Sequence, residues 1–409
     1  MSSIFEGFLS TSEVLEAFSE RNFLDAMLRF EASLARAQAS VGLIPEAAAR
    51  SIIGTCKVEL FDVAKIVRES GRAGSIAIPL VKNLKETVGL FNRDAADFVH
   101  FGSTSQDVID TALALVTRNA LGLIDADIDK AIAALLALAT RHADHPVLAR
   151  TLMQPASVTS FGLKCAGWAA PLVRSRQRLQ RTARQALSVQ LGGAVGTLAQ
   201  MQGKGAQVTA LMAADLQLKA PPFAWHTQRD EWVALGCELG LLVGNFGKIA
   251  KDISLMSQYE VGEVSEPTEP GRGGSSAMPH KRNPVACMVA LAAAQRAPQR
   301  VAALLATMPQ EHERALGNWQ AELAEWPGLL MSAHGSARAM AQALPGLQVD
   351  TARMLANIES LRAELPAGVA EEWFGLGLAR GAAELAHGQV RALADMNKSP
   401  ETTRKGGNP

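Results

Sequence analysis

Apolar residues recur three and four positions apart over most of the chain. Runs such as AIAALLALATRHA (131–143) and VALAAAQRAPQRVAALLATM (289–308) combine this spacing with strong helix-forming residues. Alternating runs of β-branched residues bounded by turn residues are scarce. The pattern therefore predicts an all-α protein with at most one small β-hairpin.

Four of the predicted helices are unusually long. They cover about residues 112–142, 159–189, 229–262 and 284–307, and each therefore has about 25–35 residues. At a rise of ~1.5 Å per residue such a helix is ~40–50 Å long, which is long for a globular domain.

The third of these helices is apolar on nearly every face over its first half, EWVALGCELGLLVGNFGKIAKDISLM (231–256). A helix of this kind must be buried on all sides. A bundle whose helices are shared between subunits would bury it, so we expect an oligomer. The apolar window 235–255 also contains charged and polar residues, which favours a core helix over a membrane span. They are Glu238, Asn245, Lys248, Lys251 and Asp252.

Segments rich in Gly, Pro, Ser and Thr interrupt the helices, and they hold most of the polar chemistry of the middle of the chain. We expect loops at 100–107, 149–159, 189–197, 219–228 and 263–284. Three helical domains are expected, at 1–110, 111–345 and 346–409. The last domain would end in a disordered tail, MNKSPETTRKGGNP (396–409).

Charge and composition exclude several classes of protein. Lys plus Arg and Asp plus Glu both number 40, so no broad field attracts nucleic acid or an anionic membrane. The N-terminus has no basic region followed by an apolar run, so we expect a cytoplasmic protein without a signal peptide. The His, Cys, Asp and Glu spacings match no metal motif, and we expect neither a metal nor another cofactor. The stretch Gln310–Arg314 reads as a solvated helix face, and we expect the histidines at 142, 145, 334 and 387 on helix or loop surfaces.

The segment GRGGSSAMPHKRNP (271–284) differs most from the helical pattern. Gly273 and Gly274 permit backbone conformations closed to other residues. Pro284 is expected at the first position of the following helix, so Lys281 and Asn283 would lie at its N-terminus, where free N–H groups favour anions. The segment predicts a mobile loop that closes over a small polyanion.

Three segments in order resemble the signatures of the fumarase/aspartase superfamily. HFGSTSQDVIDTA (100–112) is similar to the first signature, RTLMQPASVTSFG (150–162) to the second and the 271–284 segment to the third. Coverage of the resemblance runs from about residue 15 to about residue 345. The resemblance implies three helical domains with a central long five-helix bundle, which forms a twenty-helix core in a homotetramer. It also implies active sites shared between three subunits.

The resemblance also implies a reaction. Members of the superfamily add to, or eliminate from, a carbon next to a carboxylate, through an aci-carboxylate intermediate. Ser275 matches the loop serine that acts as general base, and Lys281 would help to lower its pKa in a dry, cationic site. The other candidate substrate-binding residues are His100, Thr104, Ser105, Gln154, Ser276, Met278, Asn283 and Arg314.

Two departures from the pattern favour one branch of the superfamily. The lyases carry a histidine in the second segment and pair it with a glutamate after the third. Here Leu152 and Met288 occupy these places. The 3-carboxy-cis,cis-muconate cycloisomerase branch also lacks this pair, and MPQEHERALGNWQAE (308–322) resembles it further. Pro155 replaces a histidine frequent in that branch, so a 3-sulfomuconate cycloisomerase stays an alternative, as does an adenylosuccinate lyase-like enzyme.

Overall fold

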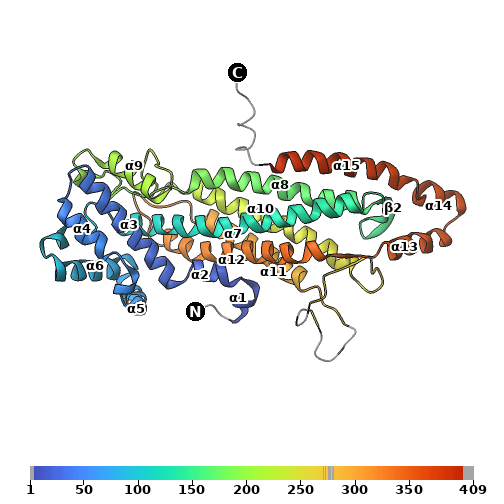
Figure 1. The fold of residues 1–409 in the computed structure, drawn as a ribbon, viewed down its shortest axis with the longest axis horizontal. Coiled ribbons are helices and arrows are strands. Elements are labelled where there is room, and N and C mark those ends of the chain that lie inside the picture. The colour runs from blue at the N-terminus through green and yellow to red at the C-terminus, as the bar shows by residue number, and fades with distance from the viewer. Residues whose placement is uncertain (1–3, 270, 272, 275–277, 279–280, 399–409) are drawn as a thin grey trace, which may run out of the picture. The chain divides into compact units, whose positions relative to one another are not determined.

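The computed structural model describes residues 4–269, 271, 273–274, 278 and 281–398. Helices make up most of these residues (Figure 1). The first helices are α1 (Ile4–Leu9), α2 (Ser12–Ala17), α3 (Glu20–Ser40), α4 (Glu46–Thr55), α5 (Val63–Ala73), α6 (Ala77–Phe91) and α7 (Ser105–Arg141). They are followed by α8 (Phe161–Ala186), α9 (Gly205–Leu216), α10 (Asp230–Met256), α11 (Val285–Ala306), α12 (Asn318–Ala343), α13 (Thr351–Glu364), α14 (Ala367–Phe374) and α15 (Leu378–Asn397).

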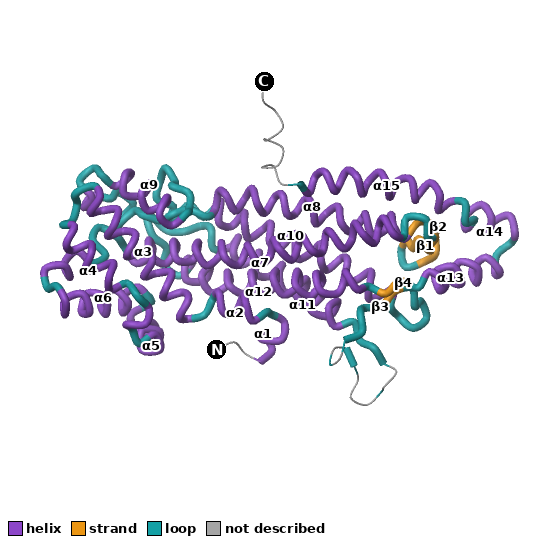
Figure 2. Tube along the Cα trace, viewed as in Figure 1, coloured by secondary structure: helices purple, strands orange, loops and turns teal. Residues whose placement is uncertain are grey.

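Strands are few and short (Figure 2). One antiparallel hairpin joins β1 (Pro146–Thr151) to β2 (Gln154–Ser160), and a second pair joins β3 (Val264–Ser265) to β4 (Gln348–Val349). Short 3₁₀ turns are found at Val58–Leu60, Asp94–Phe98, Ala199–Met201 and Leu344–Gly346. The described part of the chain is thus all-α apart from these small pairs.

The chain forms two compact units. The first contains the chain up to Leu123, together with Leu179–Leu239 and Gln299–Met331. The second contains Ile124–Arg178, Gly240–Pro298 and the chain from Ser332 onward. The expected division at residues 110 and 345 into three domains stays a prediction.

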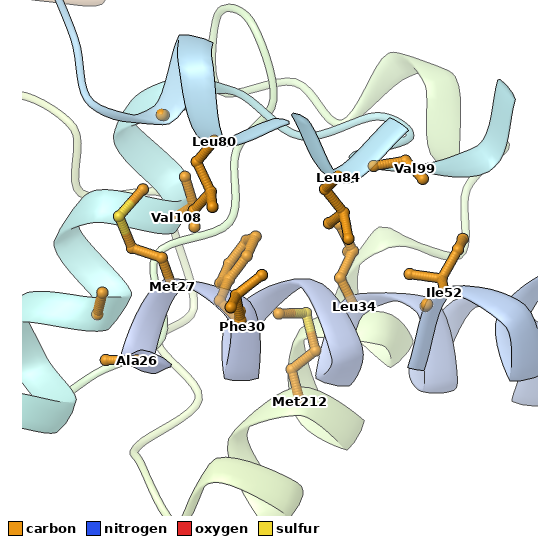
Figure 3. Packing of buried hydrophobic residues seen from close by; sticks show 14 of the residues in the cluster. Ala26, Met27, Phe30, Leu34, Ile52, Leu80, Leu84, Val99, Val108 and Met212 are labelled. Atoms are coloured by element: carbon orange, nitrogen blue, oxygen red, sulfur yellow. The ribbon is translucent and has the colours of Figure 1, made fainter. Parts of the chain in front are cut away.

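The first unit is built around α3. This helix begins after Ser19, whose side chain accepts a hydrogen bond from the N–H of Asn22, as an N-cap does. Its apolar residues recur at helical spacing, and Phe30 and Leu34 are buried. Figure 3 shows them beside side chains of α4, α6 and α9, which surround α3 with apolar surface. Burial of this surface is the main stabilising contribution to the unit.

Aromatic residues join the long helices within the first unit. Trp232 of α10 stacks on Trp326 of α12 with ring centroids 4.2 Å apart. The indole N–H of Trp326 donates to the hydroxyl of Thr117 on α7 at 2.8 Å. Gly236 faces Leu304 and Trp326, where a Cβ atom would come within 2.8 Å of the leucine. The glycine therefore permits the close packing of α10 here.

Polar pairs join the long helices within the second unit. Trp168 of α8 donates to Asp252 of α10 at 2.7 Å. His334 of α12, expected on a helix surface, is fully buried instead, and its Nε2 lies 3.1 Å from Asp127 of α7. Arg338 donates to the same carboxylate at 2.7 Å, so the buried charge of Asp127 is compensated.

The segment 149–159, expected to be a loop, is mostly the β1–β2 hairpin. Only Leu152 and Met153 form its tip, and both have left-handed backbone conformations, with φ of 49° and 68°. A two-residue turn with positive φ at both positions matches the twist of a hairpin, but it normally uses Asn and Gly. The Leu-Met pair gives no such signal, which explains why the turn was not predicted.

The four predicted long helices are confirmed as α7, α8, α10 and α11, and α12 is a fifth. α15 continues to Asn397, so the first two residues of the expected tail are helical, and residues 399–409 lie outside the described part. α10 is long and apolar enough to span a membrane by composition, but more than half of its most apolar window is buried within the protein.

Candidate active site

The first signature segment leads into the N-terminus of α7. Thr104 precedes the helix and Ser105 is its first residue. The carboxylate of Asp107 accepts a hydrogen bond from the Thr104 N–H at 3.0 Å, as an acidic residue does in a capping box. The hydroxyls of Thr104 and Ser105 are both directed to another residue.

That residue is Arg314, a predicted site residue about two hundred positions further along the chain. Its Nη1 donates to the Thr104 hydroxyl at 2.6 Å and its Nη2 to the Ser105 hydroxyl at 2.9 Å. The prediction of a solvated helix face at 310–314 is wrong, because α12 begins only at Asn318 and Arg314 lies in the segment before it. This segment allows the guanidinium to reach α7. Three of the predicted site residues are therefore brought together.

Asp107 organises the backbone around this cluster. It is fully buried, and its carboxylate accepts from the N–H groups of Gly192 and Gly193 at 3.0 and 2.9 Å. The Nε2 of His226 lies 2.7 Å from the same carboxylate. Asp107 thus fixes the loop after α8 and the segment before α10 against the start of α7.

The two glycines have no substitute in this arrangement. A Cβ atom on Gly192 would lie 2.7 Å from both Ala224 and His226. Gly193 has a φ of 68°, and its Cβ would lie 2.9 Å from the carbonyl oxygen of Gly102. A side chain at either position would push the loop away from Asp107.

His100 lies beside the cluster and is also held in place. Its Nδ1 lies 2.6 Å from the carboxylate of Glu31 on α3. Burial alone would lower the pKa of His100, but the neighbouring Glu31 carboxylate outweighs it and the pKa is raised. His100, Thr104 and Ser105 line one cavity of about 500 Å³, together with Lys82 and Lys85 of α6.

A fully buried ion network supports the cluster from the core. Arg229 donates to Asp110 at 2.8 Å and also pairs with Glu322. The indole N–H of Trp319 donates to Asp110 at 3.0 Å, so this tryptophan is a buried core residue. Burial raises the pKa of Glu322, although Arg229 opposes the shift. The network joins Asp110 of α7 and Glu322 of α12 through Arg229, which directly precedes α10.

The third signature segment lies in the second unit. Lys281 and Asn283 are exposed and line an open cavity of about 1350 Å³. The Asn283 N–H donates to the carbonyl of Gly273 at 2.8 Å, and the Lys281 N–H to that of Met278 at 3.0 Å. These bonds fold the segment back on itself. Ser275 and Ser276 lie outside the described residues.

The expected anion site at the start of α11 is already occupied. The helix begins at Val285, so Pro284 precedes it and is not its first residue. The carboxylate of Glu266 accepts from the N–H groups of Ala286 and Cys287 at 3.0 and 2.8 Å. A protein carboxylate therefore takes the place expected for substrate at these N–H groups.

The second signature segment is the β1–β2 hairpin of the second unit. Gln154 is exposed at the first position of β2, and Pro155 pairs with Arg150 beside a register shift. Leu152 at the tip is 97% exposed, and Met288 on α11 is half exposed. Neither position of the lyase relay therefore holds an ionisable group.

Among residues 4–269 and the other described positions, no group of three His, Cys, Asp or Glu side chains could hold a metal ion. The four cysteines are free, and burial raises the pKa of Cys165. The expected absence of a cofactor stays a prediction.

The sequence alone did not identify several supporting residues. They are Glu31, Gly192, Gly193, His226 and Arg229. Their partners lie up to 119 positions away in the chain, so no local spacing could connect them. Gly192, Gly193, His226 and Arg229 lie in or beside segments rich in glycine and polar residues, whereas Glu31 lies in the middle of α3 without such a signal.

Comparison with known proteins agrees with the signatures. A profile of the lyase family matches residues 9–298. The chain is 45% identical over 360 residues to a 3-carboxy-cis,cis-muconate cycloisomerase of Bradyrhizobium diazoefficiens, covering 88% of this chain and 80% of the relative. It is 44% identical over 356 residues to the Pseudomonas putida enzyme of the same name, covering 87% and 84%.

A solved structure agrees with these relatives. The crystal structure of the 3-carboxy-cis,cis-muconate lactonizing enzyme from Pseudomonas putida is similar with a TM-score of 0.83 and 38% identity. The similarity covers 98% of this chain and 92% of that one. The chain therefore belongs to the lyase family, in the branch of the 3-carboxy-cis,cis-muconate cycloisomerases.

Proposed function

We propose that this protein is a cofactor-independent cycloisomerase that converts 3-carboxy-cis,cis-muconate to 4-carboxymuconolactone, a step of aromatic catabolism in the protocatechuate branch of the β-ketoadipate pathway. The observation that carries the proposal is the convergence of Thr104, Ser105 and Arg314. Two hydroxyls and a guanidinium are suitable donors for a substrate carboxylate. The relatives' names and the absence of ionisable groups at Leu152 and Met288 support a cycloisomerase over a lyase.

The reaction forms one C–O bond and one C–H bond. A carboxylate oxygen of the substrate adds to a double bond that is conjugated with a second carboxylate. The electron pair of the double bond moves onto that second carboxylate, which gives the aci-carboxylate, and a proton then reaches the adjacent carbon. The protein must hold the attacking oxygen near its target and stabilise the new charge.

The catalytic residues in this proposal are Ser275 and Lys281. Ser275 transfers the proton, and Lys281 and Asn283 bind the carboxylate that gains charge. Gln154, Ser276 and Met278 complete the substrate contacts, together with His100 and Arg314. Lys281 and Asn283 share a cavity, which supports their assignment to one site.

A homotetramer in the cytoplasm would complete this site. Signature residues of the first unit and of the second unit would meet across subunits, with each active site shared between three chains. Exposed apolar residues on the long helices support such an assembly, since Leu241 of α10 and Met288 of α11 are each about half exposed. No interaction with nucleic acid or membrane is proposed.

The test is the loss of diene absorbance when purified protein meets 3-carboxy-cis,cis-muconate in the presence of EDTA. 3-Sulfomuconate, adenylosuccinate and fumarate are assayed beside it. Rapid loss with the carboxymuconate supports the proposal. Turnover of adenylosuccinate alone would contradict it and would require a substitute for the missing histidine.

One specific residue favours a second candidate substrate. Pro155 stands where the branch often has a histidine, and it lies next to Gln154 in β2. A site without that imidazole could be adapted to the 3-sulfo analogue. The ratio of the two kcat/KM values decides between the substrates.

The role of Ser275 is tested separately. Ser275→Ala should lower kcat by at least about a hundredfold, the usual contribution of a general acid–base group, while the tetramer stays intact. Size-exclusion chromatography with light scattering checks the assembly. Turnover like that of the wild type would remove this serine from the mechanism.

A further inference from the structure

Glu31 is a buried carboxylate with one hydrogen-bonded partner. Its Oε1 lies 2.6 Å from Nδ1 of His100, and its side chain is 1% exposed. The other oxygen, Oε2, is buried and has no hydrogen-bond partner among the described residues. A buried carboxylate needs a compensating charge, and an imidazolium at His100 provides it. The pair is therefore most stable as Glu31 carboxylate and cationic His100.

The loop that carries His100 is fixed in a strained conformation. His100 has a φ of 60°, which is uncommon for a residue other than glycine. The side-chain amide of Gln38, also on α3, donates to the carbonyl of Phe101 at 2.7 Å. α3 thus holds this loop at two points, which compensates the strain and sets the direction of the ring.

His100 lines a cavity of suitable chemistry. His100 lines the cavity of about 500 Å³ with Thr104 and Ser105. Because Nδ1 is taken by Glu31, Nε2 is the nitrogen left to donate to a ligand. Lys85 also lines this cavity, so it favours an anion.

We propose that Glu31 is a positioning residue, which keeps His100 cationic so that this cavity binds an anionic carboxylate of the substrate through Nε2. The inference rests on the proposed function, because the substrate is a polycarboxylate. Glu31 itself does not touch the substrate. It acts only through the charge and direction of His100.

The charges around His100 determine the expected pH dependence. Burial and Lys85 of α6 lower the pKa of His100, whereas Glu31 of α3 and Asp107 of α7 raise it, and the net direction is upward. Lys82 and Glu86 of α6 also line the cavity. The cation is present below this raised pKa, so carboxylate binding is complete there and is lost as the pH rises through it.

The first experiment compares kcat/KM for 3-carboxy-cis,cis-muconate across pH in the wild type and in Glu31→Gln. The amide keeps the size of the carboxylate but removes its charge. We expect the alkaline limb to move down by about one to two pH units, with a higher KM and little change in kcat at pH 8. Glu31→Asp, which keeps the charge, should restore most of the limb. Glu59 is an exposed carboxylate paired with Arg21, and Glu59→Gln is the matched control. This variant should change neither the position of the alkaline limb nor the KM.

The second experiment asks whether Glu31 acts through His100. Glu31→Gln is added to His100→Gln, and it should cause no further shift of the alkaline limb. The inference would be overturned if Glu31→Gln shifted the alkaline limb as far in the His100→Gln background as in the wild type. It would also be overturned if Glu31→Gln alone left the limb unmoved, and Glu31 would then be a structural residue.

Calorimetric binding of tricarballylate, a tricarboxylate that does not react, is measured across the same pH range. This binding does not require turnover, so it distinguishes the inference from the proposed function. Weaker tricarballylate binding at pH 8 in Glu31→Gln supports the inference even if no muconate is converted. Unchanged binding contradicts it even if the wild type converts muconate rapidly.

Discussion

At the scale of single residues, Arg314 holds the first signature segment by two separate hydrogen bonds. Its two terminal nitrogens reach the hydroxyls of Thr104 and Ser105, a geometry that the planar guanidinium fork can satisfy. A lysine has the charge but only one nitrogen. The arrangement therefore depends on the shape of the side chain as well as on its charge.

We predict that Arg314→Lys lowers kcat/KM by about 10- to 100-fold, because the two hydroxyls lose a common partner and carboxylate positioning suffers. Steady-state kinetics measure the loss, and circular dichroism checks the fold. Arg21→Lys, at an exposed ion pair, is the control and should keep full activity. If Arg314→Lys and Arg21→Lys had the same kcat/KM, only the charge of Arg314 would matter and not the shape of its side chain.

In the second unit, the pKa of Asp127 depends on the residues that donate hydrogen bonds to its carboxylate. Burial raises the pKa of Asp127, but hydrogen bonds from His334 and Arg338 outweigh it and the pKa is lowered. The stability from this carboxylate is therefore present above the unfolded pKa of about 4 and is lost as the pH falls through the lower folded pKa.

We predict that Asp127→Asn destabilises the protein by about 3 kcal/mol at pH 7, because the half-buried guanidinium of Arg338 and the buried His334 lose their carboxylate partner. The loss should shrink as the pH falls below about 4. Urea unfolding at several pH values measures it. Asp215→Asn, at the exposed pair with Arg36, is the control and should change stability by less than about 1 kcal/mol. A pH-independent loss at Asp127 would contradict the assignment.

At the scale of elements, the hairpin tip combines strain with exposure. Leu152 and Met153 are 97% and 69% exposed and both have positive φ. Each left-handed residue costs roughly 1 kcal/mol, and the two apolar side chains at the tip stay largely exposed to solvent. Strained residues of this kind are often retained for function.

We predict that the double variant Leu152→Asn and Met153→Gly raises the free energy of unfolding by about 1–2 kcal/mol. Asn-Gly is the pair that favours a two-residue turn with positive φ at both positions. The same double variant should lose activity, because it removes the side chains that the second signature segment presents. Urea midpoints and kcat/KM are measured together. A gain of stability without loss of activity would show that the tip has no functional role.

The same elements show what the sequence could predict. Helical periodicity over many turns indicated α7, α8, α10 and α11, because each turn repeats the signal, but the start of α7 and the end of α10 were misplaced by seven and six residues. The hairpin was missed, since its Leu-Met turn lacks the usual residues. The first signature was predicted as a loop; residues 100–104 lie outside any helix, but α7 already begins at Ser105. Much of the third signature lies outside the described residues. The contacts of Asp107 with His226 and of Glu31 with His100 join residues from distant elements. Only the folded chain brings these partners together.

At the scale of the whole molecule, the two units divide the predicted site residues between them. Thr104, Ser105 and Arg314 belong to the first unit, and Gln154, Lys281 and Asn283 to the second. Shared active sites in a homotetramer would join such groups from different chains. This organisation makes a specific prediction about mixtures of inactive variants.

We predict that Arg314→Ala and Lys281→Ala are each nearly inactive but regain activity when mixed after unfolding and refolded together. If the two residues of one site come from different chains, random assembly of an equal mixture leaves about a quarter of the sites intact. If both come from one chain, every site keeps one defect and no activity returns. Light scattering should give a tetramer of 43.3 kDa chains in every sample, so that a failure to regain activity reflects the origin of the residues and not a failure of assembly.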